Sequence, residues 1–154
     1  LIDRAVDTNY DEAYTQKAVA GLLAKYPKID GIVSGCGNCN IGALTAFEQA
    51  NRPLPAITGD DNNGQGCLYK RLKPTSDTLE MSNVSGRTWL VRAATRKALA
   101  AAQGMDDTEP SIVNLELTED SLNPDLPVQC AEDVSPQAVL STDLPREEVK
   151  ALLR

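Results

Sequence analysis

The sequence contains no histidine, few aromatic residues and no long apolar run. Without histidine, the chain lacks the commonest general base, the commonest metal ligand and every histidine-containing catalytic triad. The longest apolar runs, such as residues 98–102, are far shorter than the roughly 20 residues that a membrane-spanning helix needs. These absences favour a binding protein over an enzyme, and the sequence implies neither a metal nor a cofactor.

The length and net charge of the chain further limit the class of protein to which it can belong. A chain of 154 residues is one ordinary domain, or one half of a two-lobed protein. Aromatic residues make up only 4%, so aliphatic side chains must fill the core. The formal net charge of −7 argues against non-specific nucleic-acid binding, which needs clustered lysine and arginine to neutralise phosphates. We therefore expect a globular protein with no nucleic-acid partner.

Short apolar runs alternate with longer segments of helical period along most of the chain. Since alternating strands and helices are typical of βαβ units, the sequence predicts an α/β fold with a parallel sheet flanked by helices. Gly104 is a predicted C-cap for the fourth and longest helix. The predicted helices cover residues 11–26, 41–50, 65–72, 85–103 and 145–154, and the predicted strands cover residues 29–33, 55–58, 77–81 and 111–117.

Three polar segments follow the first three predicted strands: residues 34–40, 59–64 and 81–83. Ligands of open parallel sheets bind outside the carboxyl ends of the strands, so these segments should line one cleft. Asparagine, serine and carboxylate side chains complement hydroxyl groups, which both donate and accept hydrogen bonds. The pattern favours a polyhydroxylated ligand. The alternative is that residues 60–64 only form a turn and cap a helix.

Four segments in order carry a resemblance to a known family. Residues 26–33 (YPKIDGIV), 41–47 (IGALTAF), 56–64 (AITGDDNNG) and 78–86 (TLEMSNVSG) resemble segments of the periplasmic sugar-binding proteins of ABC transporters, the ribose-binding-like type I solute-binding proteins. The resemblance implies a periplasmic-binding-protein-like lobe of type I. It also implies a two-lobed protein of about twice this length, with residues 1–154 as its C-terminal half.

The resemblance implies a division of the chain. Residues 7–83 would form the C-terminal lobe, residues 84–135 would cross to or pack on the N-terminal lobe, and residues 136–154 would be a terminal segment. The chain opens at Leu1 without a methionine, so we expect a processed or truncated protein whose N-terminal half is missing. The isolated chain should then self-associate through its uncovered apolar face.

The function implied by the resemblance is that of the substrate-binding component of an ABC sugar importer. Its partners would be a small-molecule sugar, the membrane permease of the transporter and the missing N-terminal half. No bond would be made or broken. The protein would be periplasmic, or extracellular and membrane-anchored through its missing N-terminus.

The resemblance also implies ligand-binding positions. Asp61 falls where the family places a ligand-binding carboxylate, whereas Cys36 and Gly37 stand where many members have Asn-Asp. Asn38 would then substitute from a nearby position. Trp89 is interpreted as a core or lobe-interface residue in preference to a sugar-stacking platform. The candidate ligand-binding residues are Asp61, Asn38, Cys36, Ser82 and Asn62.

The four cysteines leave several readings open. Cys36 and Cys39 form a C-x-x-C pair where a strand leads into a helix, a position at which the helix N-terminus lowers a thiol pKa. A structural zinc site is disfavoured, because it needs four ligands and only one such pair exists. We predict a disulfide that joins Cys36 or Cys39 to Cys67, against free thiols as the alternative. Cys130 has no assigned partner.

Two other functions remain as rival hypotheses. The same fold serves as the effector-binding half of LacI-type transcriptional regulators, and the C-x-x-C pair is compatible with a thiol–disulfide oxidoreductase. The sequence upstream of Leu1 separates these readings, since a signal peptide and a helix-turn-helix select different functions.

Overall fold

The computed structural model describes residues 2–85, 87–141, 147–148 and 151, with the backbone alone at residues 87–89. Four strands form one mixed sheet in the order of the chain: β1 (Gly31–Ile32), β2 (Ala56–Asp60), β3 (Met81–Val84) and β4 (Leu117–Asp120). The first three strands are parallel, and β4 joins β3 antiparallel. The predicted α/β class, with a largely parallel sheet flanked by helices, is confirmed.

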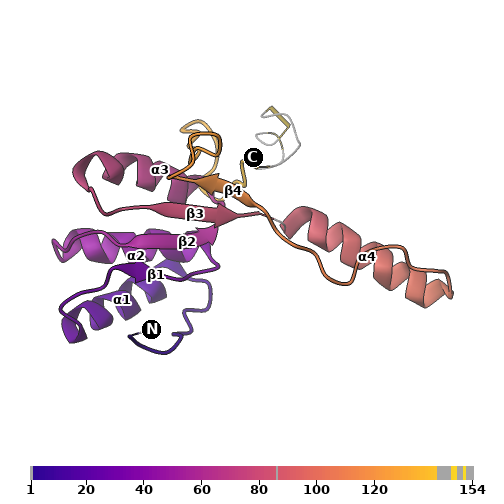
Figure 1. The fold of residues 1–154 in the computed structure, drawn as a ribbon, viewed down its shortest axis with the longest axis horizontal. Coiled ribbons are helices and arrows are strands. Elements are labelled where there is room, and N and C mark those ends of the chain that lie inside the picture. The colour runs from indigo at the N-terminus through magenta and orange to yellow at the C-terminus, as the bar shows by residue number, and fades with distance from the viewer. Residues whose placement is uncertain (1, 86, 142–146, 149–150, 152–154) are drawn as a thin grey trace.

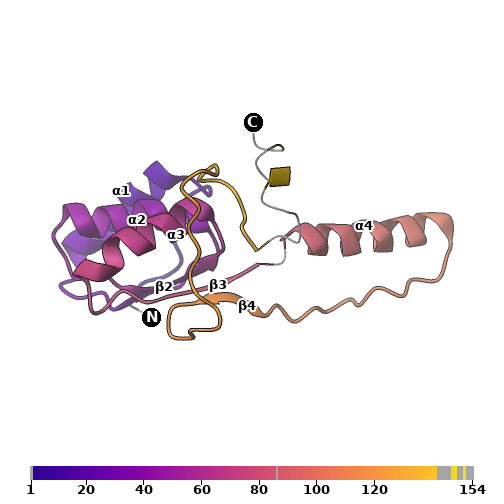
Figure 2. The same cartoon turned by 90° about the horizontal axis from the view of Figure 1, so that it is seen from above.

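Three helices cover one face of the sheet: α1 (Glu12–Lys25), α2 (Gly37–Gln49) and α3 (Asn63–Leu72). Figure 2 shows them together on the same side of the strands. The side chains of β2 alternate, so Ile57 is buried toward the helices while Thr58 is exposed on the opposite face. The main core between sheet and helices is aliphatic apart from two aromatic rings, and it includes Val19, Leu23, Leu44, Phe47, Ile57, Tyr69, Leu72, Leu79 and Met81.

Helix α1 begins within one residue of its predicted start at residue 11. The carboxylate of Asp11 accepts a hydrogen bond from the backbone N–H of Tyr14 at 2.8 Å and caps the helix. Helix α1 then lies directly against α2, where a Cβ atom at Gly42 would come within 2.1 Å of the Glu12 carbonyl oxygen. The lack of a side chain at Gly42 therefore allows the two backbones to approach.

Several predicted boundaries are corrected. The third strand covers residues 81–84 instead of 77–81, because a 3-10 turn at Lys73–Thr75 and a hydrogen bond from Leu79 N–H to the Ser76 hydroxyl delay its start. The polar loops are shorter than predicted, since β2 continues to Asp60 while α2 begins at Gly37 and α3 at Asn63. Ser82 consequently lies inside β3, opposite Thr58.

Helix α4 (Arg87–Gln103) leaves the sheet from the end of β3 and extends away from the other helices (Figure 1). Helix α4 ends at Gln103, and the φ of +64° at the next residue, Gly104, confirms the predicted C-cap. The chain then returns along α4, held by hydrogen bonds from Lys97 to the Glu109 carbonyl and from Arg96 to the Glu109 carboxylate. We call residues 87–116 the excursion, in which helix α4 runs away from the sheet and an extended chain runs back toward it.

The predicted strand at residues 111–117 is wrong in its bounds. Ile112 is 85% exposed, and strand pairing begins only at Leu117, where the chain rejoins β3. Alternating apolar residues alone do not make a strand, because the backbone also needs a neighbouring strand to hydrogen-bond. Among the described residues none lies beside residues 111–116 in the sheet.

Two further expectations fall largely outside the described residues. The side chain of Trp89 is outside them, so its predicted role stays a prediction. Of the predicted terminal helix at residues 145–154, the structure describes Glu147, Glu148 and Ala151, all helical. Among the described helices, none combines the length and apolar character needed to cross a membrane.

Candidate binding edge and its disulfide

The carboxyl ends of β1, β2 and β3 meet at one edge of the sheet, which we call the carboxyl edge. The segments that leave it are residues 33–36 after β1 and residues 61–62 after β2, and the excursion begins there after β3. Of the five predicted ligand-binding residues, the structure places Cys36, Asn38, Asp61 and Asn62 on the two segments and the first turn of α2. Ser82 is the exception. Its hydroxyl donates to the Asp120 carboxylate at 3.2 Å within the sheet.

The two neighbouring carboxylates at this edge have different partners. Asp60 accepts a hydrogen bond from the backbone N–H of Gly37, which ties the end of β2 to the first turn of α2. Asp61 accepts a hydrogen bond from the Ser141 hydroxyl and is 4% exposed. Asp60 thus binds the backbone of the lobe, whereas Asp61 already holds a hydroxyl group.

Asn62 and Asn63 organise the start of α3. The Asn62 side chain caps the helix by accepting from Gln65 N–H at 3.1 Å. The Asn63 amide, which is 3% exposed, accepts from Ala131 N–H at 2.8 Å and donates to the carbonyls of Ala131 and Val134. Asn62 therefore caps α3, and the ligand-binding role expected for it stays a prediction. Asn63 fastens residues 131–134 to the start of α3.

Backbone groups of the C-terminal segment occupy the first turn of α3. Asn63 N–H donates to the Ala138 carbonyl and Gly64 N–H donates to the Pro136 carbonyl, both at 2.8 Å. These amides are donors that a free helix N-terminus would offer to a ligand. Here they hold residues 136–138, so these two amides are already occupied at the start of α3.

A chain of buried amides runs beneath the edge from α2 to β4. The Asn40 amide donates to Gln65 Oε1 at 2.5 Å, Gln65 donates to Asn83 Oδ1 at 2.9 Å, and Asn83 donates to Glu119 Oε2 at 2.6 Å. Gly59 lies against it, since a Cβ there would come within 2.5 Å of Asn40 Nδ2. Sequence reasoning missed this network, because its members are scattered over four elements and only the structure brings them together.

Burial raises the pKa of the Glu119 carboxyl above its ordinary value, and the charge of Asp61 adds to the rise. The hydrogen bonds from Asn83 and from Gln129 N–H oppose the shift. A carboxyl whose pKa is raised in the folded state stabilises the fold below its ordinary pKa. This contribution is lost as the pH rises through the folded-state value.

Replacing Glu119 by glutamine should therefore change how stability depends on pH. We expect the parent chain to lose free energy of unfolding relative to Glu119→Gln as the pH rises from the ordinary glutamate pKa through the raised one, with a constant difference outside that window. Urea unfolding of both proteins at a series of pH values measures the difference. A difference that does not change across the series would contradict the raised pKa.

The cysteines form two disulfides, neither of which is the predicted one. Cys36 pairs with Cys39 and Cys67 pairs with Cys130. The first turn of α2 itself brings Cys36 and Cys39 together, at a Cα–Cα distance of 5.2 Å. Cys67 lies on the side of α3 against which residues 128–130 pack, so it meets Cys130 there. The predicted link between the first loop and Cys67 is wrong, and no described cysteine is free.

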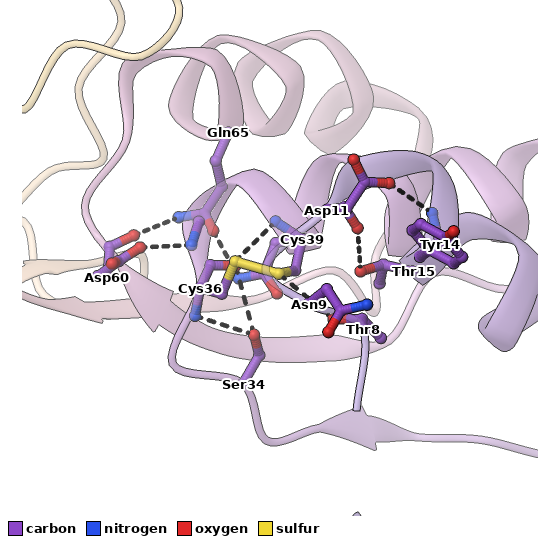
Figure 3. Close-up of a disulfide and its surroundings, with 12 residues drawn as sticks. Thr8, Asn9, Asp11, Tyr14, Thr15, Ser34, Cys36, Cys39, Asp60 and Gln65 are labelled. Atoms are coloured by element: carbon purple, nitrogen blue, oxygen red, sulfur yellow. Dashed lines mark hydrogen bonds between the residues drawn. A yellow bond between two sulfur atoms is a disulfide. The ribbon is translucent and has the colours of Figure 1, made fainter. Parts of the chain in front are cut away.

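Cys36 has a second role as the N-cap of α2. Its Sγ accepts a hydrogen bond from Cys39 N–H at 3.1 Å, and the Ser34 hydroxyl accepts one from Cys36 N–H at 3.2 Å. Thr8 of the N-terminal segment donates its hydroxyl to Cys39 Sγ at 3.6 Å. Figure 3 shows the disulfide between Ser34, Thr8 and Asp60. Both cysteines are buried, at 7% and 5% exposure.

The described residues offer no cluster of three or more histidine, cysteine, aspartate or glutamate side chains that could hold a metal ion. No protein-family model matches the chain, and no curated protein matches it. A crystal structure of a protein from Mycobacterium smegmatis is similar to it, with 17% sequence identity and a TM-score of 0.44. The match covers 71% of this chain and 36% of that one, so the chain spans about a third of its length.

Proposed function

We propose that the chain is the C-terminal half of a two-lobed, type I periplasmic-binding-protein-like protein that binds a sugar or a similar polyhydroxylated solute between its lobes. It would deliver the solute to the membrane permease of an ABC importer outside the cytoplasm. The proposal rests on the geometry of the excursion, and the polar chemistry of the carboxyl edge supports it.

The observation that carries the proposal is where the excursion leaves and rejoins the lobe. It leaves after Val84 and returns at Leu117, and these two residues are paired in the sheet at the carboxyl edge. The excursion displays large apolar side chains, with Val91 64%, Leu99 53% and Ile112 85% exposed. Exposed apolar side chains on both the helix and the extended part of the excursion support an interaction surface there. A second lobe that covered it would lie across the carboxyl edge and form a cleft there.

The chemistry of that cleft suits hydroxyl groups. Asp61 accepts the Ser141 hydroxyl, an arrangement that a sugar hydroxyl would reproduce. Asn38 is half-buried in the first turn of α2, near enough in the chain to Cys36 to share the same edge. Asp60 and Asn62 hold the loops in place through the helix starts. In the proposed protein, solute would displace Ser141 from Asp61 when the lobes close.

Self-association of the isolated chain tests the proposal that a second lobe covers the excursion. Burial of exposed apolar surface away from water is favourable. We therefore expect the 154-residue chain to sediment as a concentration-dependent oligomer when no second lobe covers that surface. The double variant Val91→Glu, Leu99→Glu should shift it toward a monomer. Analytical ultracentrifugation over a range of concentrations measures the effect.

The matched control is Tyr14→Glu, which removes an exposed aromatic ring from α1, outside the excursion. It should leave the association unchanged. A parent chain that stays monomeric at every concentration, or an association that Tyr14→Glu weakens as much as the double variant does, would contradict a covered excursion.

A further inference from the structure

The two disulfides differ in what they contribute to the fold. Cys67 and Cys130 are 63 residues apart in sequence, and their disulfide fastens the segment around Cys130 to α3. Cys36 and Cys39 are 3 residues apart, within a helix turn that holds them together in any case. The stabilisation that a disulfide gives by restricting the unfolded chain grows with the length of the loop that it closes. Cys36–Cys39 is therefore the bond that the fold can open at the smaller cost.

The surroundings of Cys36 stabilise a thiolate. Cys36 is the N-cap of the 13-residue helix α2, where the partial positive charge of the helix end favours an anion. The N–H of Cys39 already points at Cys36 Sγ, at 3.1 Å. The Asp60 carboxylate, which faces the same turn through Gly37 N–H, opposes a second negative charge there. One donor thus aims at the sulfur itself, whereas the opposing carboxylate is bound to an amide.

The bond also borders an open space. A cavity of about 1080 Å³ lies between the N-terminal segment, α1 and the sheet, and both Cys36 and Cys39 line it. Thr8 reaches the disulfide from the N-terminal wall of this cavity and donates to Cys39 Sγ. A small dithiol that enters the cavity would therefore meet the S–S bond, even though the two residues expose little surface to bulk water.

We propose that Cys36–Cys39 is a redox-active disulfide that exchanges with an external dithiol, a property beyond solute binding. The attacking thiolate bonds to Cys39 Sγ, the S–S bond breaks, and its electron pair goes to Cys36 Sγ, which the Cys39 N–H stabilises. The second thiol of the dithiol then attacks the mixed disulfide. The dithiol leaves as a disulfide, and its two hydrogens end on Cys36 and Cys39.

Graded reduction of the folded protein tests the proposal. The chain is incubated with rising concentrations of dithiothreitol, alkylated with N-ethylmaleimide, and digested for mass spectrometry. We expect Cys36 and Cys39 to be alkylated at concentrations that leave Cys67 and Cys130 joined, with circular dichroism unchanged. Opening of all four cysteines together, or of Cys67–Cys130 first, would overturn the proposal.

The thiolate itself is tested separately on the reduced protein. The rate at which Cys36 is alkylated should follow a pH profile whose midpoint lies below about 8.5, the ordinary thiol value. The variant Cys39→Ala keeps the backbone N–H of residue 39. In this variant, the midpoint of the pH profile for alkylation of Cys36 should also lie below about 8.5. A midpoint at or above the ordinary value in both proteins would show that the helix start does not activate Cys36. Neither experiment depends on whether the protein binds a sugar.

Discussion

Removal of the Cys67–Cys130 disulfide is expected to lower the free energy of unfolding of the chain by about 4 kcal/mol, the loop-entropy value for a closure of this length. The bond closes a 63-residue separation that contains β3, the whole excursion and β4. The variant Cys67→Ala, Cys130→Ala suits the test, because both residues are half-buried and alanine adds no polar group. Urea unfolding followed by circular dichroism measures the loss.

The packing around this disulfide explains why its removal should matter locally as well. A Cβ at Gly66 would come within 1.9 Å of the Gln129 carbonyl oxygen, so the returning chain lies directly on the α3 backbone. Cys36→Ala, Cys39→Ala is the matched control, since it removes a disulfide of separation 3 and should cost less. Equal losses from the two double variants, or an unchanged midpoint without Cys67–Cys130, would contradict the assignment of the long disulfide as the main covalent constraint.

The second large effect is expected at Asp61. In the proposed two-lobed protein, Asp61→Ala should weaken sugar binding by about tenfold to several hundredfold. The carboxylate can accept two hydrogen bonds from adjacent sugar hydroxyls, each contributes about 1.5–3 kcal/mol, and 1.4 kcal/mol is tenfold in affinity. Calorimetric titration with a panel of pentoses and hexoses measures the change. The expectation rests on the proposed function and on the hydroxyl that Asp61 already accepts.

Two neighbouring variants serve as controls for Asp61. Ser141→Ala removes the internal hydroxyl and should leave the affinity unchanged or raise it, since the solute no longer competes with Ser141. Asp60→Ala should lower stability by about 1 kcal/mol with less effect on affinity, because Asp60 accepts the hydrogen bond of Gly37 N–H in the first turn of α2, as a capping side chain does. Affinity that falls with Asp60→Ala and not with Asp61→Ala would reverse the two roles.

The order of elements could be predicted from the sequence because each depends on local signals. Asp11 before α1, Pro27 after it and Gly104 after α4 mark helix ends by capping or by blocking the backbone ladder. The strand bounds could not be predicted equally well. Strand pairing is a tertiary property, and the alternating residues 111–117 meet a partner strand only at their last position.

Only part of the candidate site could be predicted from the sequence. The loops that carry Cys36 and Asp61 could be predicted, since parallel strands bring their carboxyl ends to one edge. The pairing of four cysteines could not, because it depends on the return of residues 121–141 to α3 and four cysteines allow three full pairings. The buried hydrogen-bond network that links Asn40 to Glu119 likewise has no sequence signature. Asparagine and glutamine occur both in exposed loops and in buried networks, so their presence in the sequence does not tell the two apart.

The central claim is that this lobe binds a polyhydroxylated solute together with a second lobe that covers the excursion. Calorimetric titration of the proposed two-lobed protein, with the 154-residue chain alone as the control, tests it most directly. We predict saturable binding of at least one pentose or hexose by the two-lobed protein and weak or no binding by the chain alone. Absence of binding by the two-lobed protein across the panel, or equally tight binding by a monomeric 154-residue chain, would contradict the account.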